Sequence, residues 1–209
     1  MSTEILVVGI GGQGVMTAAE AIARAALEAG FEASKTEVTG MSQRGGVVCS
    51  QVRIGEHVEA SEIRPGTAHL LIAFEAAEGL RWSHFLAPEG WALVDSWRAV
   101  PPIVSSGVHK YPEDPAAQLR TAGLQVREIA ARDCAERLGD ARLANSVMLG
   151  AAAALLPIPL QVLRDQVLRR FGGRELGARN AAAFDAGRGL AAQAHGHSTY
   201  RCSAPSRPA

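Results

Sequence analysis

The sequence predicts an α/β fold, a doubly wound Rossmann-like sheet with a helical C-terminal portion. Three observations predict this fold class. Short apolar runs alternate with alanine-rich segments, a glycine-rich loop follows the first such run, and helical composition without strands begins at about residue 131. The chain has 209 residues, which is within the usual size of one domain. We expect a single domain over residues 1–194 and a disordered tail over residues 195–209.

The first strand and the first helix are the clearest elements. The continuous apolar run at residues 5–8 is typical of a strand that is covered on both faces of a parallel sheet. Residues 15–29 are rich in alanine and end at Gly30, as a helix with a C-terminal stop does. We expect the second strand at residues 31–38, followed by a polar, flexible connection over residues 40–46.

Strands alternate with a helix in the middle of the chain. Residues 47–54 and 57–60 flank Gly55-Glu56 and suggest a small hairpin, although this turn order is not the favoured one. A helix is expected over residues 76–86, before Pro88-Glu89-Gly90. Further strands are expected at residues 70–74, 91–94 and 124–129. The helical portion, expected to pack on the sheet or on a partner, comprises residues 131–138, 141–156, 160–171 and 175–194.

Charge and cysteine usage argue against several function classes. Lys+Arg and Asp+Glu balance at 21 each, so no net field attracts nucleic acid or an anionic membrane. No apolar stretch is long enough for a membrane span, and the N-terminus lacks the basic segment of a signal peptide. The three cysteines are isolated, which argues against a disulfide framework or a clustered thiolate metal site and indicates a reducing cytoplasm.

A glycine-rich loop lies between the first strand and the first helix. The segment Gly9-Ile10-Gly11-Gly12-Gln13-Gly14 matches G-x-G-x-x-G in the strand–helix context that a phosphate-binding loop requires. In such loops the first glycine permits a tight turn, the second lets a phosphate approach the main chain, and the third lets helix and strand pack closely. The N–H groups and the dipole of the helix start favour an anion. A tight turn without a ligand is the plain alternative.

A second loop follows the second strand, within Glu37-Val38-Thr39-Gly40-Met41-Ser42-Gln43-Arg44-Gly45-Gly46. In a doubly wound sheet it is expected at the same carboxyl edge as the first loop, flanking one crevice. Arg44 offers a planar fork for phosphate or carboxylate, and the adjacent glycines let a ligand or another chain approach the main chain. The alternative is a solvent-exposed hinge with an incidental arginine.

Together, the two loops resemble the gamma-type subunit or domain of 2-oxoacid:ferredoxin oxidoreductases. The combination of GIGGQGV with EVTGMSQRGG is most similar to the beta subunits of indolepyruvate ferredoxin oxidoreductases. The segments at residues 70–75, 101–102 and 145–151 are also similar, and the resemblance covers roughly residues 4 to 190. Residue by residue, the family's first loop corresponds to Gly9, Gly11, Gly12, Gln13 and Gly14, and its second loop to Met41, Gln43, Arg44, Gly45 and Gly46.

The resemblance implies a heteromeric enzyme that is inactive as this chain alone. It converts a 2-oxoacid, coenzyme A and an oxidised acceptor such as ferredoxin into an acyl-CoA, carbon dioxide and the reduced acceptor. Thiamine diphosphate and [4Fe-4S] clusters are expected on a large partner subunit, because this sequence has neither clustered cysteines nor a GDG…NN pattern. The small subunit is expected to close over the active site and to hold an anion of coenzyme A, of an aryl 2-oxoacid or of thiamine diphosphate. No catalytic or metal-binding residue is assigned to it.

Two other functions stay open at this stage. Glu32 and Glu37 lie at about the spacing at which dinucleotide sites place an acid for the ribose, so the chain is alternatively a stand-alone NAD- or FAD-binding protein. A regulatory nucleotide-sensing module is the third option. Asn145, before an apolar helix, is expected to cap it or to form an interior hydrogen bond, without a catalytic role.

Overall fold

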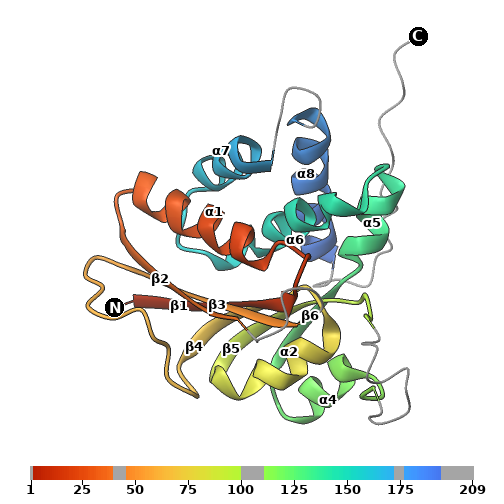
Figure 1. The fold of residues 1–209 in the computed structure, drawn as a ribbon, viewed down its shortest axis with the longest axis horizontal. Coiled ribbons are helices and arrows are strands. Elements are labelled where there is room, and N and C mark those ends of the chain that lie inside the picture. The colour runs from red at the N-terminus through yellow and green to blue at the C-terminus, as the bar shows by residue number, and fades with distance from the viewer. Residues whose placement is uncertain (1, 40–45, 100–110, 172–176, 194–209) are drawn as a thin grey trace.

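The computed structural model describes residues 2–39, 46–99, 111–171 and 177–193, and these form a mixed sheet with helices on both faces (Figure 1). The strands are β1 (Ser2–Ile10), β2 (Glu32–Thr39), β3 (Val47–Gly55), β4 (Ala68–Ala73), β5 (Leu86–Asp95) and β6 (Gln125–Ile129). The helices are α1 (Val15–Glu28), α2 (Ala76–Trp82), α4 (Pro115–Thr121), α5 (Ala131–Arg137), α6 (Ala144–Ala152), α7 (Leu160–Phe171) and α8 (Gly177–Gln193). The predicted α/β fold with a helical C-terminal portion is confirmed.

The strand order places a crevice where the sequence predicts one. The sheet has the order β2-β3-β1-β4-β5-β6, in which β1, β4, β5 and β6 are mutually parallel and β3 runs antiparallel to both β1 and β2. After β1 the chain rises into α1 above the sheet, and after the neighbouring β4 it descends into α2 below it (Figure 1). Ligands bind at this kind of switch point, outside the carboxyl ends of the strands.

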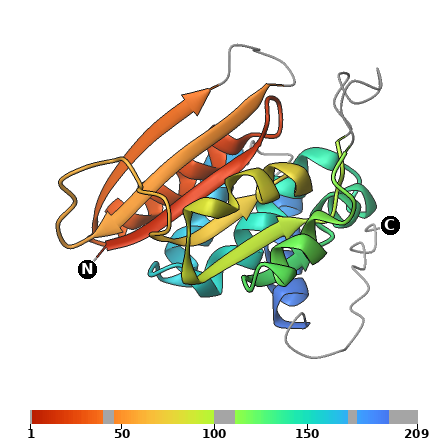
Figure 2. The same cartoon turned by 90° about the horizontal axis from the view of Figure 1, so that it is seen from below.

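The predicted hairpin between residues 47–54 and 57–60 is wrong. β3 pairs along its length with β1 on one side and β2 on the other, so both of its edges are occupied and no edge is available to residues 57–60. The antiparallel ribbon is formed instead by β2 and β3, and the sheet is therefore mixed. Seen from below in Figure 2, α2 and α4 cover the half of the sheet away from this ribbon.

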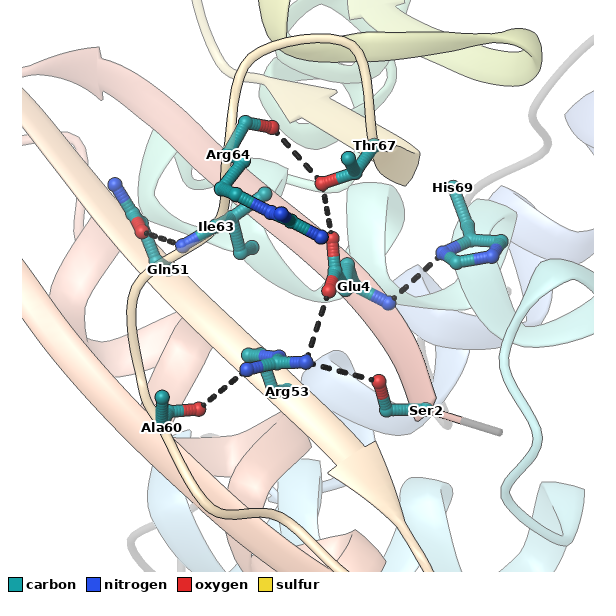
Figure 3. A network of polar contacts seen from close by, with 9 residues as sticks. All are labelled: Ser2, Glu4, Gln51, Arg53, Ala60, Ile63, Arg64, Thr67 and His69. Atoms are coloured by element: carbon teal, nitrogen blue, oxygen red, sulfur yellow. Dashed lines mark hydrogen bonds and ion pairs between the residues drawn. The ribbon is translucent and has the colours of Figure 1, made fainter.

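The segment after β3 crosses the lower face of the sheet and is held there by hydrogen bonds to residues of β1 and β3. Arg53 of β3 contacts Glu4 of β1, with 3.1 Å between Nη2 and Oε1, and Arg53 Nη1 donates to Ala60 O at 2.9 Å (Figure 3). Glu4 also accepts a hydrogen bond from the Thr67 hydroxyl. The connection between β3 and β4 is thus tied to the sheet at Ala60 and at Thr67, which fixes the entry into β4 without a covering helix.

Other expected boundaries shift for local reasons. The helix expected at residues 76–86 ends as α2 at Trp82, continues for one short 3-10 turn at Ser83–Phe85, and β5 then begins at Leu86. The helix expected over residues 141–156 is divided into a 3-10 turn, α6 and a second 3-10 turn. The short α4 was not predicted, although Asp114 caps it by accepting from Ala117 N at 3.1 Å. The expected tail at residues 195–209 lies outside the described residues.

The helical layer above the sheet packs unusually closely where α6 crosses α8. A Cβ atom built on Gly150 would lie 2.0 Å from Phe184 O, and one built on Gly187 would lie 1.9 Å from Val147 O. Main chain therefore meets main chain at this crossing, which only glycine allows. Ser146 adds a hydrogen bond from its hydroxyl to Asn180 Oδ1 at 2.7 Å. This crossing fixes α6, whose first turn reaches the glycine-rich loop.

Candidate functional site

The glycine-rich loop needs glycine for its main-chain conformation at two positions. Gly12 has φ +100° and Gly14 has φ +76°, both in the left-handed region that other residues rarely adopt. Gly14 is also the N-cap residue of α1. A Cβ atom at Gly14 would lie 2.6 Å from Asn145 Nδ2, so the third glycine makes room for α6. The sequence predicted instead that this glycine lets helix and strand pack closely.

Gln13 connects the loop to both neighbouring strands. Its Oε1 accepts from Ile10 N at 2.6 Å, and its Nε2 donates to Phe74 O at 2.9 Å, just beyond β4. A Cβ atom at Gly9 would lie 2.5 Å from Gln13 Oε1, so glycine at this position leaves room for the Gln13 side chain. The side chain of Gln13 therefore closes the turn after β1 and fastens it to the end of β4.

The end of the second loop lies against the first. Gly11 N donates to Gly46 O at 2.8 Å, which brings the two predicted loops together at one edge of the sheet. The main-chain N–H of Gly11 is thereby engaged by Gly46. The remaining second-loop residues of the prediction, Met41, Gln43, Arg44 and Gly45, lie outside the described residues.

Asn145 joins the helical layer to the glycine-rich loop. Its side chain is 8% exposed, its Nδ2 donates to Gln13 O, and its Oδ1 is enclosed without a hydrogen-bond partner. Buried amide oxygens are normally paired, because leaving one unpaired costs roughly 1–3 kcal/mol. The interior hydrogen bond expected from the sequence is thus present, and its acceptor is the loop itself. Nothing in the local sequence around Asn145 indicates that contact.

The N-terminus of α1 is suited to an anion. No side chain caps it, and its first turn contains no acidic residue. The first N–H groups of a helix lack intrahelical acceptors, and they coincide with the positive end of the helix dipole. Together these features make the start of α1 suited to an anion, at the position predicted from the glycine spacing.

A cavity of about 340 Å³ opens beside this helix start. It is formed by the first loop, by the residues that follow β4 and β5, and by the starts of α5 and α6. Trp97 provides a flat aromatic wall, and the guanidinium of Arg132 lies 4.9 Å from the centre of its ring. The cavity is also lined by Gly12, Gln13, Gly14, Asp95, Arg142 and Asn145.

Asp95 is a buried carboxylate in the wall of this cavity. It is 1% exposed, and its Oδ1 accepts from Ala131 N at 3.1 Å and from Trp97 N at 3.3 Å, so it fixes both the start of α5 and the turn after β5. Burial raises the pKa of this carboxyl to about 6, although these hydrogen bonds oppose the shift. Sequence reasoning missed Asp95; the available signal was an acidic residue directly after a buried strand.

The dinucleotide alternative is not supported. Glu37 is bound to Lys35 Nζ at 2.7 Å, and Glu32 accepts from Val58 N at 2.8 Å. Both belong to β2, which β3 separates from β1, so neither reaches the position beside the glycine loop that a ribose-binding acid occupies.

The described residues show neither a metal site nor a membrane-spanning helix. They contain no group of three or more His, Cys, Asp or Glu side chains that could hold a metal ion. None of the helices described is long and apolar enough to cross a membrane.

The fold and the crevice define a doubly wound α/β domain with a glycine-rich, anion-receptive edge. The chain belongs to the pyruvate ferredoxin/flavodoxin oxidoreductase family, whose model matches residues 4–190. This confirms the resemblance inferred from the two loops.

Relatives and solved structures agree with this assignment. The chain is 38% identical over 164 residues to indolepyruvate oxidoreductase subunit IorB of Archaeoglobus fulgidus, covering 78% of this chain and 81% of the relative. It resembles the gamma subunit of a keto/oxoacid ferredoxin oxidoreductase from Geobacter sulfurreducens, with TM-score 0.68, 27% identity, and coverage of 91% and 98% of the two chains. It also matches 33% of a chain of Magnetococcus marinus 2-oxoglutarate:ferredoxin oxidoreductase, a structure with coenzyme A bound, with TM-score 0.73, 25% identity and all of this chain covered.

Proposed function

We propose that this chain is the small subunit of a heteromeric 2-oxoacid:ferredoxin oxidoreductase that acts on an aryl 2-oxoacid such as indolepyruvate. The observation that carries the proposal is the crevice in which the glycine-rich loop, the start of α1 and the end of the second loop meet. The family match and the indolepyruvate relatives support the substrate class. The enzyme is expected in the cytoplasm.

A large subunit would supply the redox chemistry. There, thiamine diphosphate would stabilise the carbanion formed on decarboxylation, and iron–sulfur clusters would pass electrons to ferredoxin. This chain would hold the anionic part of coenzyme A at the start of α1, in the cavity walled by Trp97. Met16 in the first turn of α1 and Val38 near the end of β2 are large apolar side chains that are 44% and 49% exposed. Both lie towards the same edge of the sheet, which favours that edge as the surface that meets the large subunit.

Reconstitution tests this proposal. The chain is purified alone and after co-expression with a large subunit that carries thiamine-diphosphate and ferredoxin-type cysteine motifs, and indolepyruvate-dependent ferredoxin reduction is measured with and without coenzyme A. We expect co-purification, and activity only in the complex. Activity of the isolated chain, or failure to associate with the large subunit, would contradict the proposal. Titration with NAD(H) and FAD is the control for the stand-alone alternative.

Arg44 gives a residue-level prediction. We expect Arg44→Ala in the assembled complex to raise KM for coenzyme A or for the 2-oxoacid by about tenfold or more, since a charge-assisted hydrogen bond contributes roughly 1.5–3 kcal/mol. Which KM changes identifies the anion that Arg44 contacts. Arg64→Ala, which removes an exposed arginine from the segment between β3 and β4, is the control for loss of charge alone. Unchanged constants for both substrates in Arg44→Ala would rule out the anion contact.

A further inference from the structure

Asp95 uses only one of its two carboxylate oxygens to hold the fold. All three main-chain hydrogen bonds that it accepts go to Oδ1, from Trp97 N at 3.3 Å, Ala131 N at 3.1 Å and Arg132 N at 3.4 Å. No described residue donates to Oδ2. An enclosed side-chain atom without a partner would belong with the Oδ1 of Asn145, but Oδ2 of Asp95 does not, so it retains some accessible surface. Since Asp95 lines the cavity and is otherwise buried, Oδ2 is the atom that the cavity can reach.

Capping alone does not explain a carboxylate at this position. Asparagine would accept the same N–H groups through its side-chain carbonyl oxygen, without a buried charge. Burial acts against the ionised form here, as the raised pKa of this carboxyl indicates. We therefore look for the role of Oδ2 in the cavity, and not in the hydrogen bonds that hold the start of α5.

The cavity presents two complementary kinds of group. Around the start of α1 it attracts negative charge, and at Asp95 it offers an acceptor that needs a donor. Trp97 also lines the cavity, where the guanidinium of Arg132 lies over its ring. A phosphorylated molecule that also carries hydroxyl or amino groups, as a nucleotide does, matches both kinds of group.

We infer that Asp95 Oδ2 accepts a hydrogen bond from an O–H or N–H group of the phosphorylated co-substrate whose anionic part lies at the start of α1. The inference rests on the proposed function, in which that co-substrate is coenzyme A. Asp95 is then a specificity-determining residue: it selects for a donor on the ligand, while α1 selects for the phosphate. Inorganic pyrophosphate, which has no such donor, binds only through the phosphate contact at the start of α1.

The variant Asp95→Asn separates the two oxygens. Its carbonyl oxygen can keep the three N–H groups at the Oδ1 position, while its NH₂ group replaces the acceptor at Oδ2 by a donor. In the assembled complex we expect KM for coenzyme A to rise about tenfold, with kcat at saturation and KM for the 2-oxoacid unchanged. Competitive inhibition by pyrophosphate against coenzyme A should stay as in the unaltered complex. The melting temperature should not fall, because a neutral amide replaces a buried charge.

Dependence on pH supplies a second readout. Because Oδ1 is occupied by N–H groups, a proton added to Asp95 resides on Oδ2 and makes it a donor, as in Asp95→Asn. Arg132 and Arg142 also line the cavity and Asp133 acts on this carboxyl by its charge, and all three are shared by both forms. The ratio of KM for coenzyme A between Asp95→Asn and the unaltered complex should therefore shrink towards one as pH falls through about 6. Ionisation of the ligand's phosphates cancels in that ratio.

The outcomes are distinct. Asp114→Asn, which changes the aspartate cap of α4 away from the cavity, is the matched control and should leave every constant unchanged. An unchanged KM for coenzyme A in a folded Asp95→Asn complex would overturn the inference, as would failure of this variant to assemble, since it retains the acceptor at the Oδ1 position. A different result would contradict the proposed function itself: disruption of the glycine-rich loop that leaves KM for coenzyme A unchanged.

Discussion

Replacing Gly187 by alanine is expected to destabilise the chain by about 3 kcal/mol or more, towards the upper end of overpacking costs. The added Cβ would lie 1.9 Å from Val147 O, and the atom it meets is main chain, which cannot rotate away as a flexible side chain can. α8 and α6 must therefore separate along their crossing. For a domain of this size, the melting temperature should fall by roughly 6–12 °C. Thermal unfolding followed by circular dichroism measures the change.

The same helix contains its own control. A Cβ atom at Gly177, in the first turn of α8, would meet nothing within 4 Å, so Gly177→Ala should leave stability unchanged or raise it by up to about 1 kcal/mol. Gly150→Ala should act as Gly187→Ala does, since its Cβ would lie 2.0 Å from Phe184 O. Once either glycine has forced the helices apart, the second substitution should cost less than the first. Equal melting temperatures for Gly187→Ala and Gly177→Ala would show that the close crossing is absent.

The parallel core of the fold could be predicted from sequence, because its signal is local. The runs that became β1, β4 and β5 are continuous and apolar, as strands buried on both faces are. The place of β3 could not be predicted in this way. Its position between β2 and β1 depends on long-range pairing, which no short window of sequence contains. A tertiary pairing thus overrode the local reading of Gly55-Glu56 as a hairpin turn.

In the candidate site, too, the parts that are contiguous in sequence could be predicted and the long-range contacts could not. The glycine spacing predicted the loop and the helix start, because strand, turn and helix are contiguous. Asp95 lines the same cavity as Gly14 from 81 residues further along the chain. Asn145 contacts Gln13 from 132 residues further along. Only the fold brings these two residues to the loop. For Asp95 the carboxyl end of a buried strand was a usable signal. For Asn145 the helix-capping signal was present but identified no partner.

Gln13→Leu is expected to have the largest effect on activity among the variants considered. Leucine fills a similar volume but removes the acceptor for Ile10 N and the donor for Phe74 O. Both main-chain groups would lose their partner, and the turn between β1 and α1 would no longer be fastened to the end of β4. A displacement of about 1 Å in a binding group can lower turnover about 100-fold. We expect a fall of about that size in kcat/KM for coenzyme A in the assembled complex.

Gln118→Leu is the matched control, because Gln118 lies on the exposed face of α4 and its side chain contacts only Glu113 O among the described residues. It should leave kcat/KM unchanged. Gln13→Glu refines the test: it keeps the acceptor for Ile10 N but sets an oxygen against Phe74 O, so it should lose activity although the loop can still close. If Gln13→Leu and Gln13→Glu both retained full activity in a complex of normal stability, the geometry of the glycine-rich loop would have no part in coenzyme A use. The anion would then have to be held elsewhere, by residues of the large subunit.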